Sequence, residues 1–85
     1  MVQRLPVGKV IRSLRRELEL TQADFASRCD ITSQYLSLLE LGRVNVSLDT
    51  LMVIAAELGQ PLSSMLLAAE TLAEAERPKR SKRKS

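Results

Sequence analysis

The sequence has no histidine and no tryptophan, and it has a single cysteine, Cys29, among its 85 residues. Without histidine there is no histidine general base, and one cysteine cannot build a zinc cluster or a disulfide framework within one chain. The sequence also has no glycine-rich phosphate-binding loop. These absences argue against an enzyme, a metal site or a cofactor-dependent protein, so no catalytic residue and no cofactor are expected.

Cys29 lies near the end of a predicted helix, on the same side as Phe25 and Ala26. A free thiol there behaves as a small apolar core residue, and no histidine is available to activate it as a nucleophile. Long hydrophobic runs are missing too, since LMVIAA and MLLAA are far too short to cross a bilayer. The N-terminus has no signal-peptide core, so we expect a cytoplasmic protein with no membrane partner.

The positive charge is concentrated at one end of the chain. Residues 1–76 hold seven Lys and Arg against ten Asp and Glu, whereas residues 77–85 hold six Lys and Arg and no acid. A chain of this length builds one core, so residues 1–76 are expected to form one domain and 77–85 a disordered basic tail. The tail is expected either to attract DNA phosphates without sequence preference or only to aid solubility. The tail residues expected to meet DNA are Lys79, Arg80, Lys82, Arg83 and Lys84.

Apolar residues recur at helical spacing in three segments outside the centre of the chain. The first predicted helix spans about residues 6–19, a later one follows a cap at Ser47 and ends at Gly59, and the last runs from Pro61 to about Glu76. Leu18 is expected on the apolar stripe of the first of these helices, and Leu48 on the inward face of the second. With two further helices between residues 20 and 42, the sequence predicts an all-α, compact five-helix bundle.

The segment from Leu20 to Gly42 carries the same helix-start pattern twice, eleven residues apart. Thr21 and Thr32 are placed as N-caps, and each is flanked by an apolar pair suited to a hydrophobic staple. Between them, Asp30 lies where a turn often requires positive φ, which aspartate tolerates. Two short helices joined by so tight a turn form a helix-turn-helix, whose second helix has one face free to enter a DNA major groove.

With the helices placed, roughly Val10 to Leu66 resembles the Cro and lambda-repressor family of helix-turn-helix proteins, the XRE type. The residues that carry the resemblance are Arg15, Leu20, Thr21, Gln22, Ala26, Tyr35, Leu36, Ser37, Glu40, Gly42, Asn45, Ser47, Leu48, Leu58 and Gly59. Any one of them is weak, but the ordered set is specific. The resemblance implies a lambda-repressor-like fold and binding to double-stranded DNA.

The resemblance also assigns phosphate contacts. Gln22, at the start of the first motif helix, is expected to point outward and matches a glutamine that reaches a phosphate and braces the recognition helix. Arg43 with Asn45 matches a second phosphate clamp. Tyr35 is expected either to reach a phosphate or to pack against the first motif helix. Arg15 and Glu40 match a salt bridge that orients the recognition helix without touching bases.

The outward face of the recognition helix is expected to meet the base edges, while Leu36 and Leu39 face inward. Gln34 is the strongest candidate there, because its amide can bond bidentately to adenine. The residues expected to contact bases are Ser33, Gln34, Ser37 and Leu38.

Leu38, Leu41, Val44 and Val46 depart from the family pattern and make an apolar edge beside this face. Three interpretations stay open. The edge contacts thymine methyl groups, it binds a protein partner or second subunit, or its members are ordinary scattered surface residues.

The family usually reads two DNA half-sites with two subunits, which implies a two-fold homodimer. In the last helix, Leu62, Met65 and Leu66 are expected to close the core. The residues left for a small dimer contact are Leu67, Ala69, Leu72 and Ala73. The sequence therefore predicts a transcriptional regulator, a repressor or controller protein acting as a homodimer on a roughly palindromic operator. The alternative is an antitoxin-type module that binds a partner protein through the apolar edge.

Overall fold

The computed structural model describes residues 5–76, which form five α-helices and no strand. The helices are α1 (Val7–Glu17), α2 (Gln22–Arg28), α3 (Ser33–Glu40), α4 (Leu48–Leu58) and α5 (Leu62–Glu76). The predicted all-α architecture is thus confirmed for this part of the chain. The basic tail, including Lys79, Arg80, Lys82, Arg83 and Lys84, lies outside the described residues.

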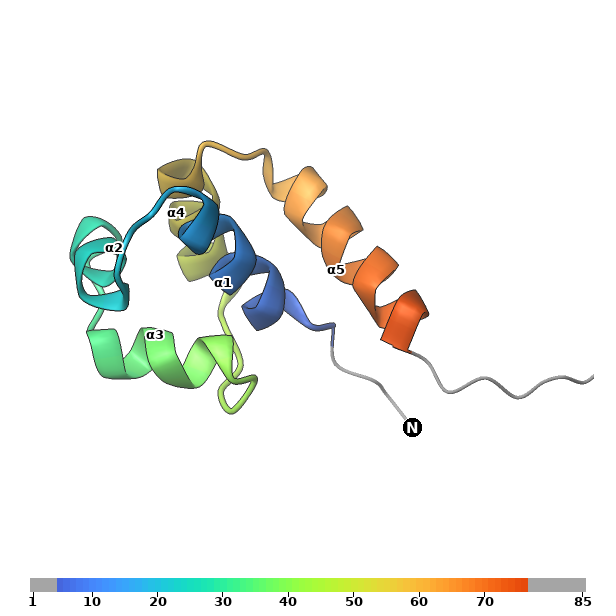
Figure 1. The fold of residues 1–85 in the computed structure, drawn as a ribbon, viewed down its shortest axis with the longest axis horizontal. Helices are drawn as coiled ribbons and strands as arrows, with labels where there is room; N and C mark the ends of the chain where they lie inside the picture. Colours follow the sequence, from blue (N-terminus) through green and yellow to red (C-terminus); the bar gives the residue numbers. More distant parts are fainter. Residues whose placement is uncertain (1–4, 77–85) are drawn as a thin grey trace, which may run out of the picture.

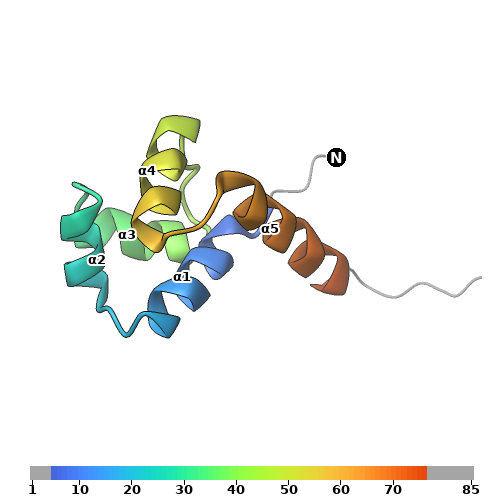
Figure 2. The same cartoon turned by 90° about the horizontal axis from the view of Figure 1, so that it is seen from above.

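α1 is the central helix, packing against α3, α4 and α5, while α2 packs against α3. In both Figure 1 and Figure 2, α2 and α5 lie at opposite ends of the bundle. The core runs between these elements, and its largest fully buried side chains are Phe25, Ile11, Leu36, Ile54 and Met65. This core holds the helix-turn-helix, α2 and α3, against α1 and leaves the outer side of α3 uncovered.

Three of the helices begin with the side-chain caps that the sequence predicts. The hydroxyl of Thr21 accepts from the Asp24 amide at 3.0 Å, and that of Thr32 accepts from the Tyr35 amide at 3.0 Å. Ser47 accepts from the Thr50 amide at 3.1 Å in the same way. Each cap satisfies an N–H that has no partner inside the helix, which fixes where the helix starts.

Four helices end in the same hydrogen-bond pattern, the Schellman motif. After α1, for example, the Leu20 amide donates to the Arg15 carbonyl and the Glu19 amide to the Arg16 carbonyl. The residue in the left-handed conformation is Glu19, Asp30, Gly42 or Gly59, with φ between 59° and 75°. Asp30, Gly42 and Gly59 are expected from the sequence, but Glu19 is not, because glutamate has no special tolerance for positive φ.

Two leucines that the helical spacing assigns to the core are exposed instead, and both lie at helix ends. Leu18 follows the last residue of α1, where the chain turns away from the bundle at Glu19. Leu48 is the first residue of α4 and is 62% exposed, so its predicted inward position is wrong. At the end of a helix the chain leaves the helical path, so a periodic pattern no longer shows which way the side chain there points.

No single helix among residues 5–76 is long and apolar enough to span a membrane. α4 and α5 reach that length and composition only when taken together, and the two are bent by 101° relative to each other.

Cys29 is a free, buried thiol in the core, as expected. Burial, with a smaller contribution from the charge of Glu57, raises the pKa of Cys29 from 9.0 to about 11. A raised pKa means that the folded state favours the neutral thiol. The neutral thiol's contribution to the stability of the fold is therefore complete below pH 9 and is lost as the pH rises towards 11.

We expect the free energy of unfolding to fall more steeply between pH 9 and pH 11 in the natural chain than in Cys29→Ala. Urea unfolding followed by circular dichroism at several pH values measures this difference. All other ionisable groups are common to both proteins and cancel in the comparison. Parallel curves would show that ionisation of Cys29 is not coupled to folding.

Candidate nucleic-acid interface

The outward face of α3 is accessible, as a DNA-reading surface requires. Ser33 and Gln34 are exposed at its first turn, Leu38 is 40% exposed one turn later, and Ser37 is half-buried. Leu36 and Leu39 point into the core and anchor the opposite face. The helix therefore presents a short polar surface that contains one leucine and no charged side chain.

Arg15 and Glu40 form a buried ion pair between α1 and the end of α3. The guanidinium donates from Nε to Glu40 Oε2 at 2.7 Å and from Nη2 to Oε1 at 3.0 Å, and both residues are buried. Arg15 also donates from Nη1 to the Leu20 carbonyl at 2.7 Å. The hydrogen bond to Glu40 raises the pKa of Arg15, so the charged form is favoured. This bidentate contact fixes α1, the following turn and α3 relative to one another.

Gln22 joins the same cluster, because its Nε2 donates to Glu40 Oε1 at 2.9 Å. This contact with α3 agrees with the brace of the recognition helix that the resemblance implies. The Gln22 side chain is half-buried, however, where an outward-pointing one is expected. An amide nitrogen carries two N–H groups, so one remains for a further acceptor. Glu40 thus orients the donor that the family resemblance assigns to a phosphate.

The loop after α3 carries the other expected phosphate contacts, Arg43 and Asn45, and both are exposed. The Tyr35 hydroxyl donates to the Asn45 carbonyl at 3.5 Å, a long and weak bond. The Tyr35 ring packs against the core. Tyr35 therefore links α3 to this loop.

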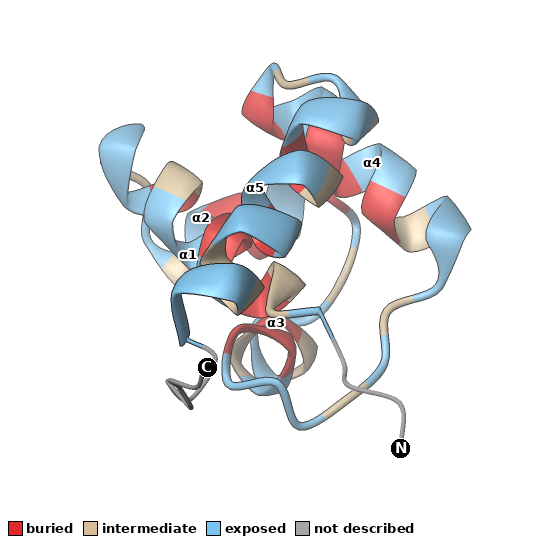
Figure 3. Cartoon of the chain, turned by 90° about the vertical axis from the view of Figure 1, so that its right-hand side faces the viewer, coloured by how far each residue is buried: buried red, intermediate tan, exposed pale blue. Residues whose placement is uncertain are grey.

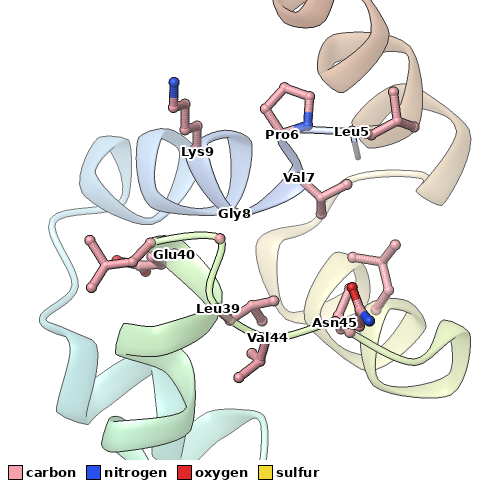
Figure 4. Close-up of a pocket in the computed structure, with 13 residues that line it drawn as sticks. Leu5, Pro6, Val7, Gly8, Lys9, Leu39, Glu40, Val44 and Asn45 are labelled. Carbon is pink, nitrogen blue, oxygen red and sulfur yellow. The ribbon is translucent and has the colours of Figure 1, made fainter. Parts of the chain in front are cut away.

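Gly8 is a structural residue of this site that the sequence does not single out. A Cβ at Gly8 would lie 2.0 Å from the Leu39 carbonyl oxygen and 3.0 Å from the Glu40 Cα. Figure 4 shows Gly8 of α1 lying against the end of α3. Only glycine allows the two backbones to approach so closely. No local signal reveals this contact, because it depends on how α1 and α3 cross.

The apolar edge beside α3 divides into two parts. Leu41 is 62% exposed, whereas Val44 and Val46 are half-buried and pack against the core. These three residues line a groove of about 560 Å³ together with the chain entering α1 (Figure 4). Only Leu38 and Leu41 therefore remain as exposed apolar side chains of this edge.

The residues of α5 expected in a dimer contact differ in how exposed they are. Leu67 is 63% exposed, and Leu72 and Ala73 are half-buried. Ala69 is 0% exposed within the single chain, so its expected place in a dimer contact is wrong. It lies four residues after the buried Met65 and shares its face. Figure 3 shows the outer side of α5 exposed along most of its length.

Comparisons with known proteins agree on one family. A helix-turn-helix family model matches residues 11–64. An immunity repressor protein of Bacillus phage phi105 is 36% identical over 72 residues, covering 85% of this chain and 49% of the phage protein. The chain thus spans about half the length of that repressor. The control protein C.MunI of Mycoplasma is 41% identical over 59 residues, covering 68% of this chain and 80% of its own.

Solved structures give the same result. The clp gene regulator ClgR of Corynebacterium glutamicum superposes with a TM-score of 0.77 at 29% identity, covering 85% of this chain and 94% of its own. The restriction-modification controller protein C.Esp1396I superposes with a TM-score of 0.70 at 25% identity, covering 80% and 92%. Because the family model covers more than half of the chain, the chain belongs to the Cro and lambda-repressor (XRE) type of helix-turn-helix family, whose members are DNA-binding transcriptional regulators.

Proposed function

We propose that the protein is a sequence-specific regulator without enzymatic activity, which binds a roughly palindromic operator in the cytoplasm as a homodimer. In this proposal α3 lies in the major groove, with Gln34 at an adenine edge and Ser33, Ser37 and Leu38 beside it. Gln22 contacts the phosphates on one side, and Arg43 and Asn45 contact those on the other. The observation that carries the proposal is the position of the Gln22 amide. Its Nε2 donates to Glu40 Oε1 at 2.9 Å, and this bond holds the amide beside the exposed face of α3.

Selection of bound duplexes from a random pool tests this function. We expect a palindromic sequence to be enriched, and we expect Gln34→Ala to lose preference at one adenine of each half-site, at a cost of about 1–3 kcal/mol in discrimination. Ser63→Ala, which removes an exposed side chain of α5, is the control and should select the same sequence. A natural chain that enriches no sequence would overturn the proposal.

The homodimer is proposed to form through the outer side of α5, around Leu67. Leu67 is the most exposed large apolar side chain of that helix, and Leu72 and Ala73 of the same helix are half-buried. We expect Leu67→Glu to produce monomers in sedimentation experiments, because a charge at an apolar contact is costly. Met52→Glu places the same charge on an exposed apolar residue of α4 and is the matched control. If Met52→Glu were monomeric and Leu67→Glu dimeric, the interface would lie on α4 and not on α5.

A second candidate function is that of an antitoxin-type module. The groove lined by Leu41, Val44 and Val46 favours it, since such an apolar hollow beside an exposed leucine suits a protein partner. The selection experiment separates the two functions. Enrichment of an operator that survives Leu41→Ser supports the regulator, whereas failure of the natural chain to enrich any sequence leaves the protein-binding function.

A further inference from the structure

A shallow depression of about 300 Å³ joins the exposed face of α1 to the helix-turn-helix. Its lining residues are Arg12, Arg15 and Arg16 of α1, Gln22 of α2, and Ser37, Glu40 and Leu41 at the end of α3. We name it the α1 depression. It therefore places arginines of α1 beside the Gln22 amide and beside one residue of the reading face.

The charges around the α1 depression are not balanced. Arg15 is paired with Glu40, and Lys9 on the same helix is paired with Glu76. Within residues 5–76, Arg12 and Arg16 make no ion pair, and both are exposed. Glu17 is the one acidic residue among those lining the neighbouring hollow on α1. Arg12 and Arg16 are thus two cations beside Gln22 that have no ion-pair partner among the described residues.

The spacing of these two arginines matters as much as their charge. Residues four apart on a helix lie side by side, with Cβ atoms about 5–6 Å from each other. Like charges in that arrangement destabilise an isolated helix, so the pair is better satisfied by an anionic ligand than by solvent alone. A nucleic-acid backbone supplies a row of such anions.

We propose that Arg12 and Arg16 bind phosphates of the same DNA strand that Gln22 contacts, extending the contact from α2 onto α1. The inference rests on the proposed function, because Gln22 and the face of α3 set where the duplex lies. The ligand is the sugar-phosphate backbone of double-stranded DNA, so the contact adds affinity without sequence preference.

The test compares salt dependence among charge variants. Binding of a labelled random-sequence duplex and of the selected operator is measured by fluorescence anisotropy over a series of NaCl concentrations. We expect Arg12→Gln/Arg16→Gln to flatten the slope of log Kobs against log [NaCl] by about 0.9 per lost contact, or about 1.8 per subunit. Affinity for the two duplexes should fall by the same factor. Arg12→Lys/Arg16→Lys keeps the charge and should keep most of the slope.

Arg28→Gln is the matched control, because Arg28 is an exposed arginine of α2 that lies outside the α1 depression. An unchanged slope in the double glutamine variant, or an equal loss in Arg28→Gln, would overturn the proposal. Thermal unfolding checks that each variant is folded. Failure of the proposed function is distinguishable, since the natural chain would then show no preference for a selected sequence over random duplex.

Discussion

Gly8→Ala is expected to destabilise the fold strongly, although alanine is the better helix former. In an open helix position the substitution would stabilise by up to about 1 kcal/mol. Here the new Cβ would lie 2.0 Å from the Leu39 carbonyl oxygen, and the atoms it meets belong to backbone. α1 must therefore move away from α3, and we expect a loss of about 3 kcal/mol, the upper end for overpacked cores.

Urea unfolding followed by circular dichroism measures the effect, and Ser13→Ala is the control. Ser13 is exposed on the same helix, so its replacement by alanine should be neutral or slightly stabilising. The sign of the change in the free energy of unfolding of Gly8→Ala tests the close contact between α1 and α3. An increase in stability would mean that α1 and the end of α3 are not in contact through their backbones.

Glu40→Ala is expected to cost about 3–5 kcal/mol, because it leaves the buried Arg15 guanidinium without its carboxylate. Gln22 loses its acceptor in the same variant. Natural domains are stable by only about 5–15 kcal/mol, so this variant should be partly unfolded at moderate temperature. Thermal and urea unfolding give the loss directly.

Replacing both Arg15 and Glu40 shows whether Glu40→Ala destabilises the fold through an unpaired buried charge or through lost packing. Arg15→Met/Glu40→Leu removes the buried charge together with its counter-ion, and we expect it to recover most of the stability lost in Glu40→Ala. The double variant should nevertheless bind DNA more weakly than the natural chain, because the Gln22 amide is no longer held. A double variant as unstable as Glu40→Ala would show that packing, and not the uncompensated charge, dominates.

The parts of the fold that the sequence predicts well are the local ones. Each helix cap is a hydrogen bond from a backbone amide to a hydroxyl three residues earlier, at Thr21, Thr32 and Ser47. Such caps can therefore be recognised without knowing the tertiary structure. The Arg15–Glu40 pair joins distant segments, and the sequence predicts it only through the family resemblance.

The features that the sequence does not predict depend on how helices cross. Gly8 has no unusual φ and no turn signal, and its role appears only when α1 is placed on α3. The hydrogen bond from Gln22 to Glu40 also depends on the angle between α2 and α3, and only the family resemblance implies that Gln22 braces the recognition helix. Ala69 is different, since its spacing from Met65 places it in the core. The last helix carries more apolar residues than a small core needs, so the sequence alone does not show which of them are left for a second subunit.

The outward face of α3 has a consequence for how such proteins diversify. Within residues 5–76, the side chains of Ser33, Gln34 and Ser37 make no hydrogen bond to the rest of the chain, while Leu36, Leu39 and Glu40 hold the helix from behind. Substitutions on the outward face therefore disturb few interactions that maintain the fold. If this face reads the operator as proposed, operator preference can change by substitution of the outward residues, or by grafting another surface in the laboratory, while the rest of the fold stays the same.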